Sequence, residues 1–545
     1  LATGMAEQLT PPTTPDGRGS GLLHSSVVVG AATMTSRVLG LVRDVVLAAL
    51  IGASSNADAF FVAFKIPNFL RRLFAEGAFA QAFIPVLAET REEGGLQAVK
   101  ALTDRVAGVL GGTLLLLTAL TIMAAPLVAM IFAPGFSRDA AKLALTAELI
   151  RLTFPYLFLI SMTGFAGAVL NAYGRFAVPA FTPVLLNLSL ISAALFVAPL
   201  MQEPVYALAL GVLIAGLLQL LFQLPFLYGL ELLPRPRWDT QAPGVRRILT
   251  LMVPALFGVS VSQINLLLDT VLASLLPAGS VSWLYYSDRL TELPLGVFAI
   301  AIATVILPAL SSQQALAQAS GEQGDRARDV FAATLRWAIR CVMFIALPAT
   351  LALLILAEPI LSTLFQYGAF GAPDVEKAGY SLRAYTLGLT AFMLVKVLAP
   401  GFYARQDMKT PVRIGIIAMV ANMVMNPLFI FPLMWWFDLG HVGLAVATSL
   451  SAWLNAGLLY RGLNREGVLR VPDDGSGYGL MLMIGLGTMG FVLWLLTPEL
   501  SWWLNGGMTE RVVAMSGLVV AGVLGYVLPL YAMGLRLHQF RSPNQ

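Results

Sequence analysis

Residues 36–89 of this 545-residue chain read SRVLGLVRDVVLAALIGASSNADAFFVAFKIPNFLRRLFAEGAFAQAFIPVLAE, and they decide the class of fold. They predict two apolar helices joined by a polar turn at 52–58. The charged residues of this stretch are Arg37, Arg43, Lys65, Arg71, Arg72, Asp44, Asp58 and Glu76, followed at its end by Glu89. Each charge near the centre of a bilayer costs at least about 2.5–3.5 kcal/mol. The cations therefore require a water-filled cavity, partner charges or an anionic ligand.

Arginine is well suited to one such anion, because its planar guanidinium gives a phosphate two parallel, charge-assisted hydrogen bonds. We therefore expect a cationic cavity inside the membrane that holds a phosphorylated substrate. A second interpretation stays open, in which the cations only tie helices together. The acidic partners available for that role are Asp44, Asp58, Glu76, Asp288 and Glu292.

The overall composition is that of an all-α polytopic membrane protein. The chain is 58% hydrophobic and 12% charged, whereas a soluble domain is about half apolar and about a quarter charged. Apolar runs long enough to cross a bilayer recur along the chain. One cysteine, Cys341, and three scattered histidines predict neither a disulfide framework nor a metal centre, so no cofactor is expected. The sequence contains no Walker A pattern, and we expect no ATP hydrolysis.

Breaks in hydropathy predict about fourteen transmembrane helices. Their limits are 24–50, 59–89, 104–132, 143–172, 178–200, 204–229, 247–275, 281–312, 330–365, 378–403, 411–435, 440–461, 478–497 and 512–536. The N-terminal tail and the even-numbered connections carry most of the arginines and lysines, so the positive-inside rule places both termini in the cytoplasm. Residues 1–23 are expected to be a disordered cytoplasmic extension, in which Met5 is a candidate native start.

An internal repeat divides these helices into two lobes. The matching pairs are FIPVLA at 83–88 with ILPALS at 306–311, IFAPGF at 131–136 with LFQYGAF at 364–370, and NAYGRFAVP at 171–179 with YARQDMKTP at 403–411. Each copy holds six spans, so the lobes form a parallel repeat with a pseudo-twofold axis along the membrane normal, as in transporters that rock around a midplane site. The predicted divisions are an N-lobe at 24–229, a cytoplasmic linker at 230–246, a C-lobe at 247–461, and two extra helices with a tail at 462–545.

Long motifs across nearly the whole chain resemble a single family. They are SRVLGLVRD at 36–44, 57–89 of the opening stretch, GVSVSQINLLLDT at 258–270, VSWLYYSDRL at 281–290, LFQYGAF at 364–370 and VLAPGFYARQDMKTPV at 397–412. The chain resembles the MurJ (MviN) family of lipid II flippases, within the multidrug/oligosaccharidyl-lipid/polysaccharide exporter superfamily. The resemblance implies a two-lobe, fourteen-helix fold. It also implies movement of undecaprenyl-pyrophosphate-linked disaccharide pentapeptide (lipid II) from the inner to the outer leaflet for peptidoglycan synthesis.

The resemblance also assigns residues to substrate binding. The positions that match the family are Arg37, Arg43, Arg71, Arg289, Asp58 and Glu76. The last two helices would shape a groove for the polyprenyl tail. In a straight helix Arg37 and Arg43 point about 120° apart, and a bend at Gly40 could aim both inward.

Two further cations of the opening stretch carry separate expectations. Lys65 could contact the substrate, or it could be neutralised by Asp58 or Glu76. Arg72 points about 100° away from Arg71 in an α-helix, so we expect it to extend towards the membrane interface.

A group of oxygen-bearing side chains is predicted inside the C-lobe. Asp269 lies in an apolar span, and Asn422 and Asn426 share one face of a later helix. Thr448 lies in the span after that. Because oxygen ligands suit a hard cation, we expect a Na⁺ or H⁺ coupling site. The alternative is a structural polar cluster, or an ion pair between Asp269 and Lys396.

Three classes of function follow from these features. The first is the flippase, working by alternating access and reset by the membrane potential or a cation gradient. The second is an exporter of another polyprenyl-phosphate-linked glycan, or a cation-coupled antiporter of the same superfamily, although a basic cavity disfavours organic cations. The third is an intramembrane enzyme that uses Asp58 and Glu76, but no nucleophile–base motif stands out. We therefore expect a transporter and not an enzyme.

The expected partners are lipid II and membrane lipids, with contacts to the cell-wall elongation and division machinery and none to nucleic acid. The chain is expected to be a monomer in the bacterial cytoplasmic membrane.

Overall fold

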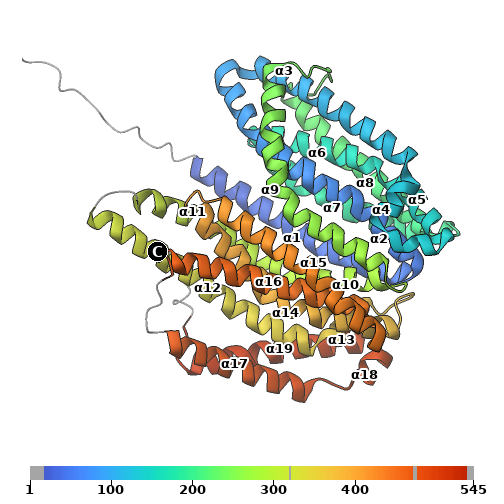
Figure 1. Ribbon diagram of the computed structural model, residues 1–545, viewed down its shortest axis with the longest axis vertical. Coiled ribbons are helices and arrows are strands. Elements are labelled where there is room, and N and C mark those ends of the chain that lie inside the picture. The colour runs from blue at the N-terminus through green and yellow to red at the C-terminus, as the bar shows by residue number, and fades with distance from the viewer. Residues whose placement is uncertain (1–17, 318–320, 470–474, 537–545) are drawn as a thin grey trace, which may run out of the picture.

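The computed structural model describes residues 18–317, 321–469 and 475–536, apart from the side chains of 18–28, 74–77, 257–262, 300 and 475–476. Within these ranges the chain forms helices and their connections, with no strand (Figure 1). The predicted all-α class is confirmed. Of the predicted extension, residues 1–17 lie outside the described ranges, and α1 already begins at Arg18 rather than at residue 24.

The first half of the chain forms a bundle in which α1 packs on α7, α2 on α5, α3 on α6, and α6 on α8. Its elements are α1 (Arg18–Ile51), α2 (Ser55–Leu70), η1 (Arg71–Phe79), α3 (Ala80–Met123), α4 (Ala125–Phe132), η2 (Pro134–Arg138), α5 (Ala140–Thr153), α6 (Pro155–Ala172), α7 (Ala177–Ser192), η3 (Ala193–Val197), η4 (Ala198–Leu200) and α8 (Pro204–Gly229).

The second half is built around α14, which packs on α10, α12 and α16. Its elements are α9 (Pro243–Ser274), α10 (Ser280–Pro294), η5 (Leu295–Ala299), α11 (Ile300–Ala317), α12 (Glu322–Ile355), α13 (Ala357–Phe365), α14 (Ala372–Tyr403), α15 (Lys409–Phe437) and α16 (Gly440–Arg465). The last helices are α17 (Gly475–Leu496), α18 (Leu500–Asn505) and α19 (Met508–Ala532). The pair α17 and α19 packs outside this bundle, against α12 and α13, along the lower edge of Figure 1.

Eleven helices among the described residues are long and apolar enough to cross a membrane. Two predicted spans share α3, which changes direction at Gly95, where φ is 62° and the backbone is not helical. This break lies in the predicted connection between the second and third spans. Helices α1, α2 and α9 are not among the eleven, and α1 and α2 carry the charges of the opening stretch. The count of fourteen therefore stays a prediction.

Matching interruptions support the internal repeat. In the first half, α2 passes through the π-helical segment η1 into α3, and Pro85 follows. In the second half, α10 passes through the π-helical segment η5 into α11, and Pro308 follows. A π-helical turn inside an α-helix is rare and marks functional sites. Both interruptions lie next to the segments that the repeat aligned.

The linker between the lobes is fixed to the first lobe. The backbone N–H of Arg235 donates to Asp104 Oδ1 at 2.7 Å, and that of Arg237 donates to the Asp104 carbonyl at 2.9 Å. Gly108 faces the Arg237 backbone so closely that a Cβ there would overlap it. Helix α9 then contacts α3 and η1 on one side and α15 on the other. It therefore connects the two lobes, and their predicted boundaries stay a prediction.

Candidate functional site

The two lobes touch at one end and diverge towards the other (Figure 1). At the closed end the N–H of Ala369 donates to the carbonyl of Ala49 at 2.9 Å. Gly52 and Gly368, at φ 58° and 56°, leave no room for a Cβ against Ala369 and Ala49. We call the contacts of residues 49–58, 135 and 142 with residues 274–286, 368 and 369 the interlobe seal. Positive φ and close backbone approach both favour glycine there.

Asp58 lies at the centre of this seal and is 1% exposed. Its Oδ1 accepts from the N–H and the Oγ of Ser282 at 3.0 and 2.7 Å. Its Oδ2 accepts from the N–H of Gly279 at 2.8 Å and from Lys142 Nζ at 3.1 Å. The carboxylate thus joins α2 and α5 to the start of α10. Asp58 is not among the residues that line the cavity, so its predicted role in substrate binding stays a prediction.

A cavity of about 280 Å³ lies between the lobes, next to the seal. Its cationic wall residues outnumber its acidic ones. The cations are Arg43, Lys65, Arg71, Arg72 and Arg289, and the acids are Asp269, Asp288 and Glu292. Most of the aromatic and aliphatic side chains in the wall come from α2, α9 and α10, and others come from α4, α7 and α14. All five cations are among the charges that the sequence analysis singled out. A cationic wall of this kind attracts an anion, and the role of these residues in substrate binding stays a prediction.

Arg43 is held by neighbouring side chains and is 6% exposed. Its Nε and Nη2 donate to Asp44 Oδ1 at 2.9 and 2.7 Å, and its Nη1 donates to Asn187 Oδ1 at 3.0 Å. Its Nη2 also donates to the hydroxyl of Tyr285 at 3.3 Å. Arg43 is therefore paired with Asp44, and its guanidinium links α1, α7 and α10. Because Arg43 also lines the cavity, its role in substrate binding stays a prediction.

Arg289 extends the same network to the cavity surface. Its Nε lies 3.5 Å from Asp44 Oδ2, and its Nη1 donates to Glu292 Oε2 at 2.8 Å. The guanidinium lies over the ring of Tyr285, 5.1 Å from its centroid. About a third of its side chain is exposed. Arg289 is thus both paired and accessible to a ligand.

Lys65 and Arg72 are the exposed cations of the wall. Lys65 interacts electrostatically with Asp288 and Asp269, and no ion pair joins it to either. Asp58 does not neutralise it, because that carboxylate is bound to Lys142. Arg72 was expected at the membrane interface, and this is wrong. The expectation assumed α-helical geometry, but Arg72 lies in η1, where the wider π-helical turn brings Arg71 and Arg72 to the same cavity.

Arg37 lies apart from the cavity wall. Its guanidinium packs directly on Gly296 in η5, where a Cβ would overlap its terminal nitrogens. Helix α1 is uninterrupted at Gly40, so the two arginines keep separate directions. Glu76, the remaining acidic candidate, has a side chain that lies outside the described part of the structure.

The four residues predicted as a cation site come together from three helices. Asn426 Nδ2 donates to Asp269 Oδ1 at 3.2 Å and to Asn422 Oδ1 at 3.0 Å. Thr448 Oγ1 lies 3.5 Å from both Asp269 Oδ2 and Asn422 Nδ2. We call this group the polar ring. Asn426 Oδ1 is buried without a described partner, and the described contacts include none between Asp269 and Lys396.

Several residues of these networks were missed from the sequence. Lys142 was counted only among the connection charges, although it lies 9% exposed against Asp58 and over the ring of Phe136. Asn187 and Tyr285, which fix Arg43, lie in ordinary apolar helices. Lys142 is 84 residues from Asp58, and no local pattern relates the two.

The comparisons with known proteins agree with this architecture. Residues 47–514 match the family model described as lipid II flippase MurJ. A Vibrio cholerae protein named "Probable lipid II flippase MurJ" is 49% identical over 532 residues, covering 96% of this chain and 98% of its own. A Burkholderia cenocepacia protein named lipid II flippase MurJ is 39% identical over 527 residues, covering 95% of this chain and 99% of its own.

Solved structures show the same fold. A lipid II flippase MurJ in an inward closed conformation superposes with a TM-score of 0.75 at 25% identity, covering 92% of this chain and 98% of its own. An inward-facing multidrug transporter of the MATE family and MOP superfamily superposes with a TM-score of 0.62 at 16% identity, covering 81% of this chain and 98% of its own. This similarity shows the fold alone.

Two helical lobes with eleven candidate membrane spans among the described residues form a multi-pass membrane protein, and the relatives named as flippases make it a transporter and not an enzyme. Within that class, the chain belongs to the lipid II flippase MurJ family.

Proposed function

We propose that this protein moves lipid II across the cytoplasmic membrane for peptidoglycan synthesis and that the central cavity binds its diphosphate. The observation that carries the proposal is the cavity wall, where Lys65, Arg72 and Arg289 face the space between the lobes. A diphosphate offers Lys65 and Arg72 charge-assisted hydrogen bonds that none of their described ion pairs supplies, and it can reach the exposed third of the paired Arg289. Family membership supplies the substrate class.

The size of the cavity supports alternating access. Its volume of about 280 Å³ is just below the range of about 300–1,000 Å³ for sites that hold a drug-sized ligand. A diphosphate fits, but a disaccharide pentapeptide needs the lobes to separate. In our proposal the seal holds the outer side closed while the head group enters from the cytoplasmic side, with both termini in the cytoplasm. The seal then opens as the lobes rock.

The polar ring is the proposed coupling site for Na⁺ or H⁺. Asp269 supplies the charge, the Asn426 amide and the Thr448 hydroxyl contact its two carboxylate oxygens, and Asn422 joins the group through Asn426 and Thr448. Asp269 also lines the cavity, so a cation there would act on the same space as the substrate. The expected result for Asp269→Asn is transport that no longer responds to sodium or pH. An unchanged response would leave the ring a structural cluster.

The experiment that tests the flippase proposal makes this protein the only candidate flippase in a depletable bacterial host. On depletion, the lipid-linked muropeptide should accumulate on the cytoplasmic leaflet. The intact protein should relieve that accumulation, and Arg289→Ala should not. Normal export without the protein would assign it to another polyprenyl-phosphate-linked glycan, the second function that a basic cavity allows.

The proposed state is a monomer, and contacts with elongation and division proteins stay predictions.

A further inference from the structure

A second cluster of cations lies away from the central cavity, at the end of α15 and α16. A surface groove there is lined by Thr410, Arg413, Ile414, Ile417, Leu458, Arg461, Gly462 and Arg465. We call it the arginine groove. Arg413 lies near the start of α15, and Arg461 and Arg465 lie one turn apart in the last turns of α16. Ile414, Ile417 and Leu458 form its apolar floor.

The three arginines lack acidic partners among the described residues. The acids nearest in the chain are already engaged: Glu466 pairs with Arg405, and Asp407 accepts from the N–H of Thr410 at 3.0 Å. Arg461 and Arg465 are like charges at i and i+4, which disfavours their helix. All three side chains are exposed. An arrangement that brings three unpaired guanidinium groups together is explained by an anion that lies between them.

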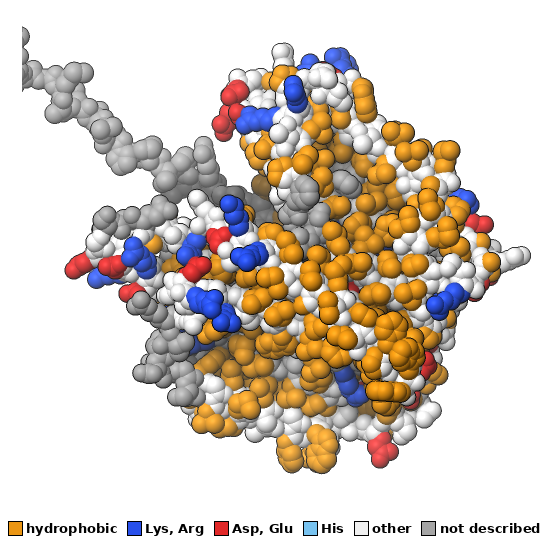
Figure 2. Space-filling model, viewed as in Figure 1, with side chains coloured by type: hydrophobic (Ala, Val, Ile, Leu, Met, Phe, Trp, Pro, Cys, Tyr) orange, Lys and Arg blue, Asp and Glu red, His pale blue; other side chains and the backbone are white. Residues whose placement is uncertain are grey.

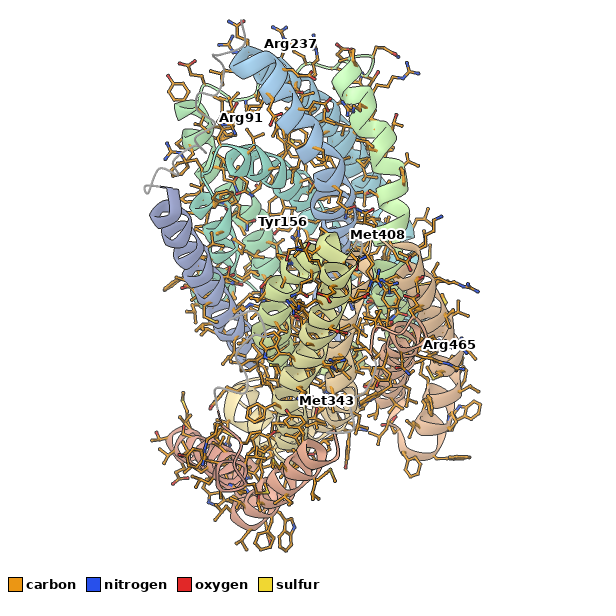
Figure 3. The ribbon with its side chains drawn as sticks, turned by 90° about the vertical axis from the view of Figure 1, so that its left-hand side faces the viewer. Arg91, Tyr156, Arg237, Met343, Met408 and Arg465 are labelled. Carbon is orange, nitrogen blue, oxygen red and sulfur yellow. The ribbon has the colours of Figure 1, made fainter. Side chains whose placement is uncertain are left out.

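The position of the groove indicates which anion. The arginines lie where α15 begins and α16 ends, at the ends of predicted membrane spans, and the apolar floor continues towards their middle. On the face that Figure 2 shows, blue side chains gather towards the left with red ones among them, beside an orange, hydrophobic surface. Figure 3 shows Arg465 on the second lobe, apart from Arg91 and Arg237 at the far end of the first. A phosphate head group at the membrane surface, with acyl chains below it, fits both parts of the groove.

We propose that the arginine groove binds an anionic phospholipid, with its phosphate between Arg413, Arg461 and Arg465 and its chains along Ile414, Ile417 and Leu458. The site is separate from the central cavity, since the two share no lining residue. A lipid bound there joins α15 to α16, the two helices that carry Asn422, Asn426 and Thr448.

The test is native mass spectrometry of the purified full-length protein titrated with phosphatidylglycerol, and separately with phosphatidylcholine. Each arginine near a membrane surface contributes about five-fold to the affinity for an anionic lipid. We therefore expect the double variant Arg461→Gln with Arg465→Gln to lower the affinity of the tightest-bound phosphatidylglycerol about thirty-fold. Arg413→Gln, on the other helix, should weaken it about five-fold. Phosphatidylcholine binding should stay unchanged.

The matched control is Arg175→Gln with Arg246→Gln, which removes two exposed cations, one before α7 and one in α9, that do not line the groove. An equal loss of phosphatidylglycerol affinity in this control would show that the effect comes from general charge at the membrane surface, and it would overturn the proposal. Unchanged binding in both groove variants would overturn it as well. Displacement of phosphatidylglycerol by millimolar inorganic phosphate would do the same, because the site would then accept a free anion.

Discussion

Helix α2 carries two charges two turns apart that have opposite surroundings. Asp58, at its start, is 1% exposed and accepts four hydrogen bonds. Lys65, further along the same helix, is exposed to the cavity and has no ion pair among the described residues. A bilayer disfavours both charges equally. The protein therefore compensates the first with its own groups and leaves the second for water or a ligand.

The difference separates the residues that hold the lobes from the residues that hold the substrate. Arg43 belongs with Asp58, because Asp44, Asn187 and Tyr285 occupy its donors. Arg72 belongs with Lys65, and Arg289 takes part in both groups. Loss of a satisfied charge should change which conformation is populated, whereas loss of an unsatisfied charge should change binding.

The largest effect is expected at the unsatisfied charge. Lys65→Gln should lower lipid II transport about ten- to a hundred-fold, because a hydrogen bond to a charged group contributes about 1.5–3 kcal/mol. The melting temperature should change little, since Lys65 forms no ion pair among the described residues and interacts with Asp269 and Asp288 only at longer range. Transport is measured by the leaflet distribution of the lipid-linked muropeptide in the depletable host.

The matched control for this variant is Lys396→Gln, an exposed cation of α14 that does not line the cavity. Equal losses in both variants would show that overall charge matters and that the position in the cavity does not.

The second effect is expected at the satisfied charge. Asp58→Asn leaves Lys142 without its carboxylate, and breaking a buried pair costs about 3–5 kcal/mol. The seal should open more often. Ser280, which lies within the seal and is 1% exposed, can be changed to Cys in a Cys341→Ser background. Its labelling in cells by a membrane-impermeant maleimide should rise at least about tenfold.

Asp438→Asn is the control here, because Asp438 forms an exposed ion pair with Lys377 at the same end of the molecule. If Asp58→Asn left labelling at the level of this control, the seal would not depend on the Asp58 carboxylate.

These two classes of charge could be predicted only in part from the sequence. Apolar surroundings were enough to single out every cation of the opening stretch, and the i, i+4 spacing of Asn422 and Asn426 was enough to predict the polar ring. The pairing of each charge was not accessible, because it depends on helices far apart in the chain, as with Lys142 and Asp58. The direction of Arg72 was missed because η1 is π-helical.

A smaller effect is expected at Gly296, because the lack of a side chain there leaves room for the Arg37 guanidinium. Gly296→Ala would force the Arg37 guanidinium away from η5. Because Arg37 is the end of a flexible side chain, stability should change by less than about 1 kcal/mol. Transport should fall several-fold if Arg37 acts on the substrate as the family resemblance implies.

Gly517→Ala serves as the comparison, since a Cβ at this glycine of α19 meets nothing within 4 Å. Normal transport in Gly296→Ala would assign Arg37 to packing alone.

The most direct test of the cavity is equilibrium binding to the full-length protein in lipid nanodiscs, with undecaprenyl diphosphate and undecaprenyl monophosphate as ligands. The unsatisfied cations should favour the diphosphate, and Lys65→Gln should weaken it about tenfold or more while Lys396→Gln leaves it unchanged. Equal affinity for the two lipids, or diphosphate binding that Lys65→Gln does not weaken, would contradict the account.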